Sequence, residues 1–312
     1  MSLKVVFMGT PDFALPALER LVSKYDVCAV LTGEDKPRGR GHEVVYTPIK
    51  KYALEHGIEI YTPRTLKDED IQEKLASYHA DVFVVAAYGK ILPRRILDMP
   101  RLGCVNIHGS LLPSYRGAAP IQWSIIDGRK KTGITTMLMN EELDTGDILE
   151  KYEVDILPDE TGGSLFDKLS KLGADAIEDT LDRLSSGQIT PVPQADTDTD
   201  YAKIITKDMA HIDWSASSRW LERYVRSFDP FPGCYTNLHG NIIKIWRLEV
   251  LEDDSSETIM PGSIQIDAIL GIKVKTGDGW VLIKQLQKAG KKRMSSKDFL
   301  NGNKVSADDR FE

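Results

Sequence analysis

Residues 4–21 read KVVFMGTPDFALPALERL, an apolar run that passes through a glycine into a helical pattern. The run from Lys4 to Met8 is short, continuous and rich in β-formers, which is typical of a buried strand. Pro16 is tolerated only in the first turn of a helix, and Leu18 and Leu21 follow it at helical spacing. These residues therefore predict a strand, a tight turn at Gly9 and a helix, the opening of a βαβ unit.

The turn after this first strand argues against a nicotinamide cofactor. Its sequence, Gly9-Thr10-Pro11-Asp12, lacks the second and third glycines that let a backbone approach a pyrophosphate. No phosphate-binding loop of the GxxxxGK[ST] type occurs in the chain either. Gly9 is expected either to form a tight strand-to-helix turn or to line a ligand pocket.

Further apolar runs alternate with helical patterns through the first half of the chain, at residues 27–32, 81–87, 104–107 and 134–139. Such alternation predicts parallel strands joined by helical crossovers, an α/β domain with a Rossmann-like parallel sheet. A capping-box pattern at residues 164–167 opens a long helix that Gly187 ends. We expect this first domain to span residues 1–187.

The composition changes abruptly at residue 188. Pro191, Pro193 and alternating Asp and Thr predict a linker over residues 188–205. Beyond it, Trp220, Tyr224 and Phe228 mark an amphipathic helix, which is followed by short β-patterned runs at residues 234–238, 242–250, 263–266, 272–275 and 280–286. One helix and several short strands predict a small OB-like β-barrel domain over residues 206–312.

Composition excludes several classes of protein. The chain has 312 residues, and its net charge of −7 argues against a protein that coats nucleic acid indiscriminately. No apolar run approaches the roughly 20 residues that span a bilayer, and no secretory signal opens the chain, so we expect a cytoplasmic protein. The 3 cysteines show no CxxC spacing, and neither a disulfide framework nor a metal site is expected.

Polar side chains gather at the end of the strand predicted near residue 104. Asn106 and His108 are two residues apart, so their side chains project to the same face. Ligands of open parallel sheets bind at the carboxyl ends of the strands. Asp144 lies on an acidic loop after the next strand, and we expect it at the same edge. An amide donor, an imidazole and a carboxylate suit acyl transfer, with the amide stabilising an oxyanion and the imidazole moving a proton.

Four segments carry a family resemblance: residues 7–14, 87–93, 106–122 and 143–147. They resemble the methionyl-tRNA formyltransferase family, and the similarity extends through the barrel to Met294. The resemblance implies transfer of the formyl group of 10-formyltetrahydrofolate, a cosubstrate, to methionine on initiator tRNA. It assigns catalysis to Asn106, His108 and Asp144, and folate binding to Tyr88, Gly89, Ile91, Leu92, Ser110, Leu111, Leu112 and Pro113.

Three groups of basic residues are candidates for binding the tRNA that this resemblance implies. In the predicted loop of residues 33–48, Lys36, Arg38 and Arg40 are interleaved with Gly and Pro, and Arg40 matches the family's key arginine. A second group, Lys291, Lys292 and Arg293, lies in the barrel, where it could meet phosphates. A third is the helix carrying Arg219, Arg223 and Arg226. Each group could equally consist of ordinary solvent-exposed surface residues with no role in binding.

Two other hypotheses about the function stay open. An amino-sugar nucleotide or water could replace tRNA as formyl acceptor, because the same motif serves other enzymes that use this folate. A non-catalytic folate- or RNA-binding module would need no acyl-transfer residues, so Asn106, His108 and Asp144 count against it. Within the enzyme reading, Asp144 either accepts the ammonium proton or orients His108. We expect a monomer.

Overall fold

The computed structural model describes residues 2–38, 43–197, 199–252 and 259–312. Across these ranges, no helix combines the length and apolar character needed to cross a bilayer. The chain forms two compact units, each assembled from three segments. The first unit comprises Met1–Pro120, Lys131–Asp155 and Phe166–Ala202, and the second comprises Ile121–Lys130, Ile156–Leu165 and Lys203–Glu312.

The first unit is built on a 7-stranded sheet of order β5-β2-β1-β6-β7-β8-β9. Its strands are β1 (Lys4–Gly9), β2 (Asp26–Leu31), β5 (Glu59–Tyr61), β6 (Val82–Ala86), β7 (Cys104–His108), β8 (Lys131–Leu138) and β9 (Ile148–Asp155). Across the sheet, the five neighbouring strands β5, β2, β1, β6 and β7 run parallel. The short hairpin of β3 (Lys36–Arg38) and β4 (Glu43–Val45) forms a separate sheet. The predicted Rossmann-like α/β fold is confirmed.

Strand direction departs from the sequence prediction in β8. This strand covers the predicted run 134–139 but pairs antiparallel with β7, and β9 pairs antiparallel with β8 in turn. A parallel return needs a crossover of a dozen or more residues, usually a helix that covers the sheet. The only helix between β7 and β8 in the described chain is α5 (Pro120–Ile126), and residues 121–130 belong to the second unit. The prediction that the run 134–139 forms a parallel strand was therefore wrong, since an apolar run does not encode strand direction.

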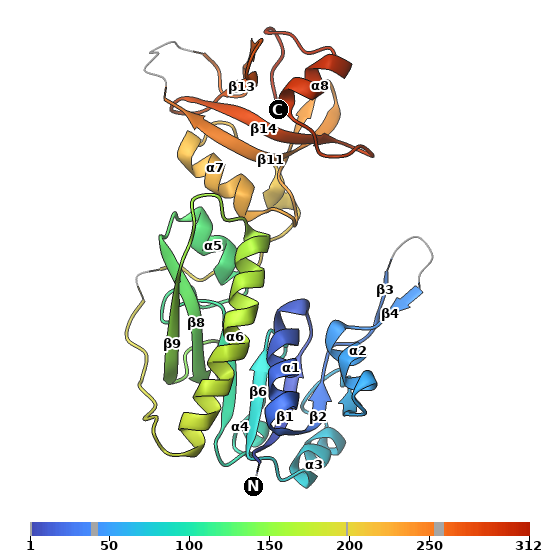
Figure 1. Cartoon of the computed structure of the whole chain (residues 1–312), viewed down its shortest axis with the longest axis vertical. Helices are drawn as coiled ribbons and strands as arrows, with labels where there is room; N and C mark the ends of the chain where they lie inside the picture. The colour runs from blue at the N-terminus through green and yellow to red at the C-terminus, as the bar shows by residue number, and fades with distance from the viewer. Residues whose placement is uncertain (1, 39–42, 198, 253–258) are drawn as a thin grey trace. The chain divides into compact units, whose positions relative to one another are not determined.

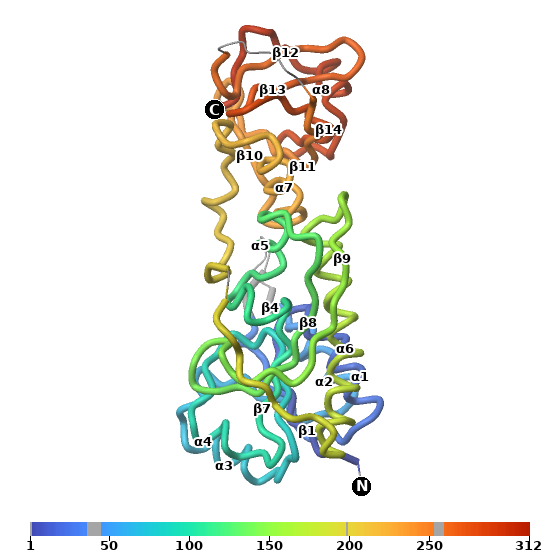
Figure 2. The backbone as a smooth tube through the Cα atoms, turned by 90° about the vertical axis from the view of Figure 1, so that its left-hand side faces the viewer, coloured from blue at the N-terminus to red at the C-terminus, as the bar shows by residue number. Residues whose placement is uncertain are grey.

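Helices cover both faces of this sheet. The helices α1 (Leu15–Lys24) and α6 (Gly162–Ser185) lie on one face, and α3 (Glu69–Ser77) and α4 (Arg94–Leu97) lie on the other (Figure 2). The side chains of Leu75 and Ile96 pack with Val6 and Phe83 in one buried cluster. On the opposite face, a Cβ added at Gly173 of α6 would approach Ile107 Cγ2 to 3.0 Å. The face that carries Ile107 is thus closed by α6.

The long helix α6 begins with a capping box, three residues earlier than the sequence pattern indicated. Thr161 is the residue before the helix, and its Oγ1 accepts from Ser164 N at 3.1 Å. In return, Ser164 Oγ accepts from Thr161 N at 2.9 Å. This exchange satisfies amide groups that a helix end leaves unpaired. Gly187, with φ of 71°, follows the last turn as predicted.

The second unit is a 5-stranded antiparallel sheet of order β10-β11-β14-β13-β12. Its strands are β10 (Tyr235–Leu238), β11 (Asn241–Leu251), β12 (Ile264–Asp267), β13 (Gly271–Lys275) and β14 (Trp280–Lys288). The helix α7 (Ser218–Ser227) packs against β11, and α8 (Ser296–Gly302) against β13 and β14 (Figure 1). The predicted small OB-like domain is confirmed. The remaining α-helix is α2 (Pro48–Glu55), in the first unit.

The segment 188–202 is fastened to the rest of the first unit at Val192 and at Ala202. Val192 and Ile148 exchange backbone hydrogen bonds of 2.8 and 2.9 Å. Ala202 N donates to Arg116 O at 2.8 Å, and Ala202 O accepts from the amide of Ala118. The first unit ends at Ala202, inside the predicted linker.

Candidate active site

Strand β7 places Asn106 and His108 on the sheet face that α6 does not cover. In the antiparallel register, Asn106 lies opposite Met137 and His108 opposite Thr135. Both polar side chains are nearly buried, with exposed fractions of 9% and 6%. Among the residues that the structure describes, none forms a hydrogen bond with the Asn106 side-chain amide. Its N–H groups are thus available to a substrate oxygen.

A backbone carbonyl fixes the tautomer of His108. His108 Nε2 lies 3.0 Å from Tyr115 O. A carbonyl oxygen only accepts hydrogen bonds, so Nε2 carries a proton, and Nδ1 of the neutral ring holds the free lone pair. The nitrogen able to take up a proton is therefore Nδ1.

Asp144 faces that nitrogen. Its Oδ1 lies 3.7 Å from His108 Nδ1, and its Oδ2 accepts from Gly117 N at 2.9 Å. The first distance is too long for a hydrogen bond, so the contact between the carboxylate and the ring is electrostatic. The structure thus brings His108 and Asp144 of the predicted catalytic set together.

Asp144 reaches His108 by a route that the sequence did not predict. Strand β8 ends at Leu138 opposite Val105, near the amino end of β7. The following loop, residues 139–147, therefore does not begin at the carboxyl edge of the parallel strands. It crosses the face on which His108 lies, and Asp144 adopts a positive φ of 54° there.

The predicted folate-contacting turn of residues 110–113 is tied to β8 by one hydroxyl. Thr135 Oγ1 donates to Ser110 O at 2.7 Å and accepts from Leu112 N at 3.0 Å. Ser110 Oγ donates to Ser114 O at 2.6 Å. Ser110 and Leu112 are buried, whereas Leu111 and Pro113 are half-buried. Leu111 and Pro113 therefore keep more surface for contact than their buried neighbours.

The second predicted folate segment combines buried and exposed residues. Tyr88 and Leu92 are buried in the core, Gly89 has φ of 74°, and the Ile91 side chain is 80% exposed. Burial raises the pKa of Tyr88 above its ordinary value. Its hydroxyl is buried without a hydrogen-bond partner among the described residues. A buried hydroxyl without a partner is unfavourable, and a ligand group could satisfy it.

The predicted tRNA-binding residues differ in what the structure shows of them. Lys36 and Arg38 lie on β3, of which the backbone is described, and Arg40 lies outside the described residues. Lys291 and Lys292 are exposed. Arg293 donates to both carboxylate oxygens of Asp229, at 2.9 and 2.8 Å, and its guanidinium lies 3.5 Å from the centre of the Trp246 ring. Arg293 is thus engaged within its own unit.

The basic face predicted for α7 is largely used by internal contacts. Arg223 Nε donates to Ile126 O at 2.9 Å. Arg226 Nη1 donates to Glu160 O at 2.7 Å, and its Nε pairs with Glu222 at 3.0 Å. These contacts anchor segments 121–130 and 156–165 to the second unit, to which they belong.

Sequence reasoning missed two side chains that hold this site, Gln194 and Thr135. Gln194 lies in a segment whose composition indicated a linker, and Thr135 is one of several β-branched residues of a strand. Neither carried a local signal, because each acts through contacts distant in sequence. Cys104 is buried, and burial raises the pKa of its thiol to about 12, which suits a packed residue. No three potential metal ligands cluster within the described ranges.

Comparisons with known protein families match nearly the whole chain. Residues 3–181 match the family model described as formyl transferase, and residues 204–304 match its C-terminal domain. Among solved structures, the sugar 3N-formyl transferase WlaRD aligns with a TM-score of 0.65 at 18% identity, covering 94% of this chain and all of that one. HypX from Aquifex aeolicus aligns with a TM-score of 0.63 at 16% identity, covering 98% of this chain and 49% of that one. These structures share the fold.

Curated relatives are much closer in sequence. Methionyl-tRNA formyltransferase of Ruminiclostridium cellulolyticum is 44% identical over 99% of each chain. The protein of the same name from Lachnospira eligens is 45% identical over 98% of each chain, and that of Geobacter metallireducens is 46% identical over 96% of each. The chain therefore belongs to the methionyl-tRNA formyltransferase family of formyl transferases.

Proposed function

We propose that the protein transfers the formyl group of 10-formyltetrahydrofolate to the α-amino group of methionine on initiator methionyl-tRNA. The observation that carries this proposal is the meeting of His108 and Asp144 on a face that also presents the Asn106 amide, within a chain of this family. The product is formylmethionyl-tRNA, which serves translation initiation in the cytoplasm.

His108 acts as the proton acceptor in this proposal. Because Tyr115 O holds the Nε2 proton, Nδ1 is the basic nitrogen and can take a proton from the attacking amine. Asp144, at 3.7 Å, then stabilises the imidazolium that forms. An α-amine has a reference pKa of about 7.7 to 8.0, so a useful neutral fraction exists near neutral pH. This arrangement favours the supporting role for Asp144 over that of first proton acceptor.

Asn106 stabilises the oxyanion. Attack on the formyl carbon moves negative charge onto the formyl oxygen, and a fixed amide N–H opposite that oxygen lowers the barrier. Side chains two residues apart on a strand lie roughly 7 Å from each other. The reacting carbon is proposed to lie between Asn106 and His108. The tetrahedral intermediate then collapses as the bond from the formyl carbon to N10 of the folate breaks, and N10 takes up the proton that His108 accepted from the amine, so tetrahydrofolate leaves without a covalent enzyme intermediate.

The folate site is proposed around residues 88–92 and 110–113. The Tyr88 hydroxyl, which has no hydrogen-bond partner among the described residues, and the exposed Ile91 side chain support this placement, as does the turn held by Thr135. We assign Tyr88, Gly89, Ile91, Leu92, Ser110, Leu111, Leu112 and Pro113 to it.

We assign tRNA binding to two basic groups, Lys36, Arg38 and Arg40 in the loop and Lys291 and Lys292 in the barrel. Arg293 supports the barrel group through its contacts with Asp229 and Trp246. The proposed catalytic domain spans residues 1–187 and the proposed tRNA-binding domain residues 206–312, joined by residues 188–205.

A direct assay tests this function. The purified protein is incubated with 10-formyltetrahydrofolate and methionine-charged initiator tRNA, and formylated product is measured. Elongator tRNA charged with methionine is the control, and we expect it to be formylated far more slowly. Formylation of an amino-sugar nucleotide, with none of methionyl-tRNA, would contradict the proposed acceptor.

A further inference from the structure

Gln194 holds the loop that carries Asp144, although it lies 50 residues away in sequence. Its Nε2 donates to Asp144 O at 2.9 Å and to Gly146 O at 2.8 Å. Both hydrogens of the side-chain amide are therefore used on backbone carbonyls of this one loop. A single side chain thus fastens the loop on either side of Thr145.

The opposite end of the Gln194 amide is fixed by Arg116. Arg116 Nε and Nη2 donate to Gln194 Oε1 at 3.0 and 2.8 Å. A guanidinium only donates and a carbonyl only accepts, so only one orientation of the amide satisfies both sides. Glutamine is suited to this place because glutamate has the same shape but no donor for the two carbonyls.

The backbone that Gln194 holds is one that needs support. Asp144 has φ of 54°, in the left-handed region that residues other than glycine seldom adopt. Such conformations persist where surrounding contacts enforce them. This backbone conformation places the Asp144 carboxylate against Gly117 N and His108 Nδ1.

We propose that Gln194 is a positioning residue for Asp144, and that it acts on formyl transfer only through that carboxylate. This inference rests on the proposed function. It makes the Gln194 side chain part of the apparatus that holds the catalytic carboxylate. The backbone of that segment is anchored at Val192 and at Ala202 by hydrogen bonds of its own, so a change confined to the Gln194 side chain leaves the segment in place.

The variant Gln194→Glu tests the proposal in the full-length protein. Glutamate keeps the size of the side chain and its contact with Arg116. However, it places a carboxylate oxygen, which cannot donate, against the carbonyl oxygens of Asp144 and Gly146. Displacement of a catalytic group by about 1 Å costs up to about 100-fold in rate, so we expect kcat to fall about 10- to 100-fold with each KM within about twofold. Gln188→Glu makes the same change at an exposed glutamine of this segment, and its kcat should equal that of the wild type.

Coupling to Asp144 separates positioning from a general structural effect. In an Asp144→Asn background, Gln194→Glu should lower kcat by less than about threefold, because the carboxylate it positions is already gone. Equal losses in both backgrounds, or a normal kcat for Gln194→Glu, would overturn the proposal. If that variant fails to fold, Gln194→Met, which removes the donors without adding charge, is measured in both backgrounds with the same criteria. A wild type without activity on methionyl-tRNA would instead refute the proposed function.

Discussion

Thr135 shows how one buried hydroxyl controls a binding turn. It is fully buried on β8, opposite His108, and bonds at once to Ser110 O and Leu112 N. Both backbone groups lie in the turn that we assign to folate. Buried backbone groups without partners are costly, so this hydroxyl both stabilises the fold and shapes the turn.

Replacing Thr135 by Val should separate the effects of its hydroxyl on stability and on the folate turn from the effect of side-chain packing. Thr135→Val keeps the shape and removes the hydroxyl, which leaves two backbone groups unsatisfied. We expect unfolding free energy to fall by about 1 to 3 kcal/mol, measured by urea denaturation. The KM for 10-formyltetrahydrofolate should rise. Thr135→Ser, which retains the hydroxyl, should keep the KM of the wild type. A raised KM in both variants would show that the methyl group matters instead.

Asn106 is the residue whose loss should affect turnover most selectively. Asn106→Ala removes a donor that contacts the oxygen mainly as charge develops on it. We expect kcat to fall about 100- to 1,000-fold, with folate affinity within a few fold, measured by steady-state kinetics and equilibrium binding. An equal loss of turnover and of binding would show that Asn106 binds the ground state.

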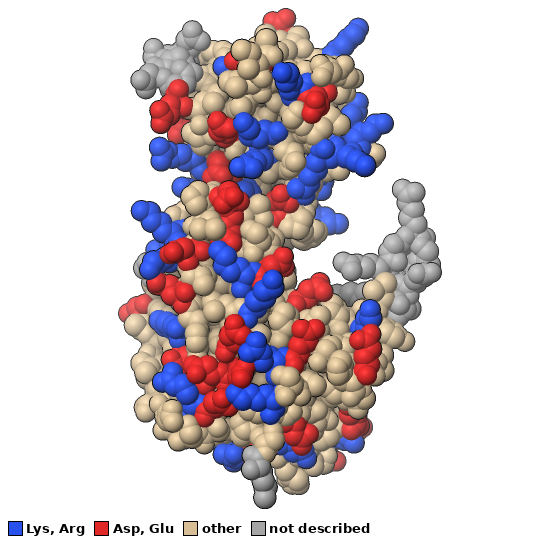
Figure 3. Space-filling model, viewed as in Figure 1, with Lys and Arg blue, Asp and Glu red and all other residues tan. Residues whose placement is uncertain are grey.

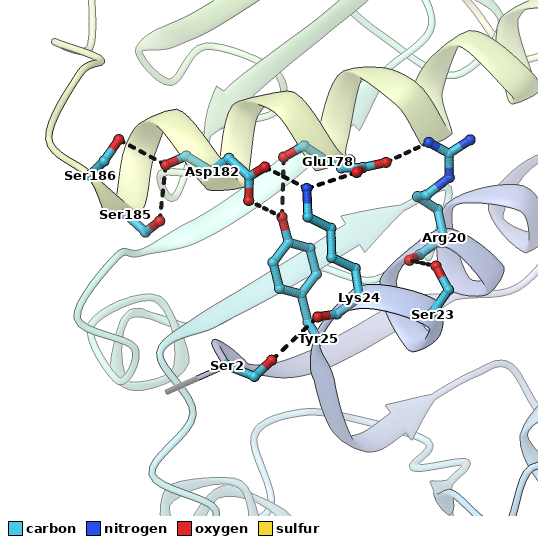
Figure 4. A network of polar contacts seen from close by, with 9 residues as sticks. All are labelled: Ser2, Arg20, Ser23, Lys24, Tyr25, Glu178, Asp182, Ser185 and Ser186. Carbon is cyan, nitrogen blue, oxygen red and sulfur yellow. Dashed lines mark hydrogen bonds and ion pairs between the residues drawn. The ribbon is translucent and has the colours of Figure 1, made fainter.

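Helices α1 and α6 are joined by a network of charged groups on their outer surface. Lys24 Nζ lies 2.7 Å from Glu178, Arg20 pairs with Glu178, and Tyr25 donates to Asp182 at 2.7 Å (Figure 4). Both signs of charge alternate over these helices (Figure 3). Hydrogen bonds from Lys24 hold the pKa values of the Glu178 and Asp182 carboxyls below their ordinary range.

This network makes a small part of the stability dependent on pH. A carboxylate with a lowered pKa in the folded state stabilises the fold above its unfolded pKa, and that contribution is lost as the pH falls. The network is partly exposed to solvent, so Lys24→Met should cost at most about 1 kcal/mol near pH 7. The difference from the wild type should shrink below about pH 4, near the reference values of Asp and Glu. Urea unfolding from pH 3 to 7 measures it.

The exposed Lys171 of α6 offers the matched control for this experiment, because the same change there removes a charge outside the network. The unfolding free energy of Lys171→Met should differ from that of the wild type by an amount that does not shrink below about pH 4. A Lys24→Met difference that stayed constant down to pH 3 would contradict the assignment.

Charge is distributed unevenly along the molecule. Residues 1–205 hold 24 basic and 32 acidic side chains, and residues 206–312 hold 16 and 15, so the net charges are −8 and +1. An anionic partner is therefore met more favourably by the carboxyl-terminal part. Lys291 and Lys292 are exposed there, whereas Arg293 is held by Asp229.

The salt dependence of tRNA use tests this distribution. Each phosphate contact adds about 0.7 to 0.9 to the slope of log affinity against log salt concentration. Replacing Lys291 and Lys292 together by Ala should make the slope of kcat/KM for tRNA shallower by about 1.5. The pair Lys67→Ala and Lys171→Ala, an equal loss of charge in the first unit, should leave the slope unchanged. An unchanged slope in the barrel variant would remove both lysines from the tRNA site.

Local patterns predicted the elements of this chain well. The five predicted barrel strands correspond to β10 through β14, and the runs at 4–8, 27–32, 81–87 and 104–107 correspond to β1, β2, β6 and β7. The spacing of Asn106 and His108 was enough to place them on one face, since alternation along a strand is a local property. The strands β3 and β4, which pair within the predicted loop of residues 33–48, and the strands β5 and β9 went unpredicted.

Periodicity and motif spacing were thus sufficient for most strand positions, for the two-part architecture and for placing Asn106 and His108 on one face of their strand. They were not sufficient for the antiparallel direction of β8, for the path of the loop that carries Asp144, or for the hydrogen bonds of Gln194. Side-chain alternation arises from the geometry of neighbouring residues, and so it can be seen in a short window. Strand direction and the contacts of Gln194 depend on partners that are distant along the chain and meet only once the protein has folded.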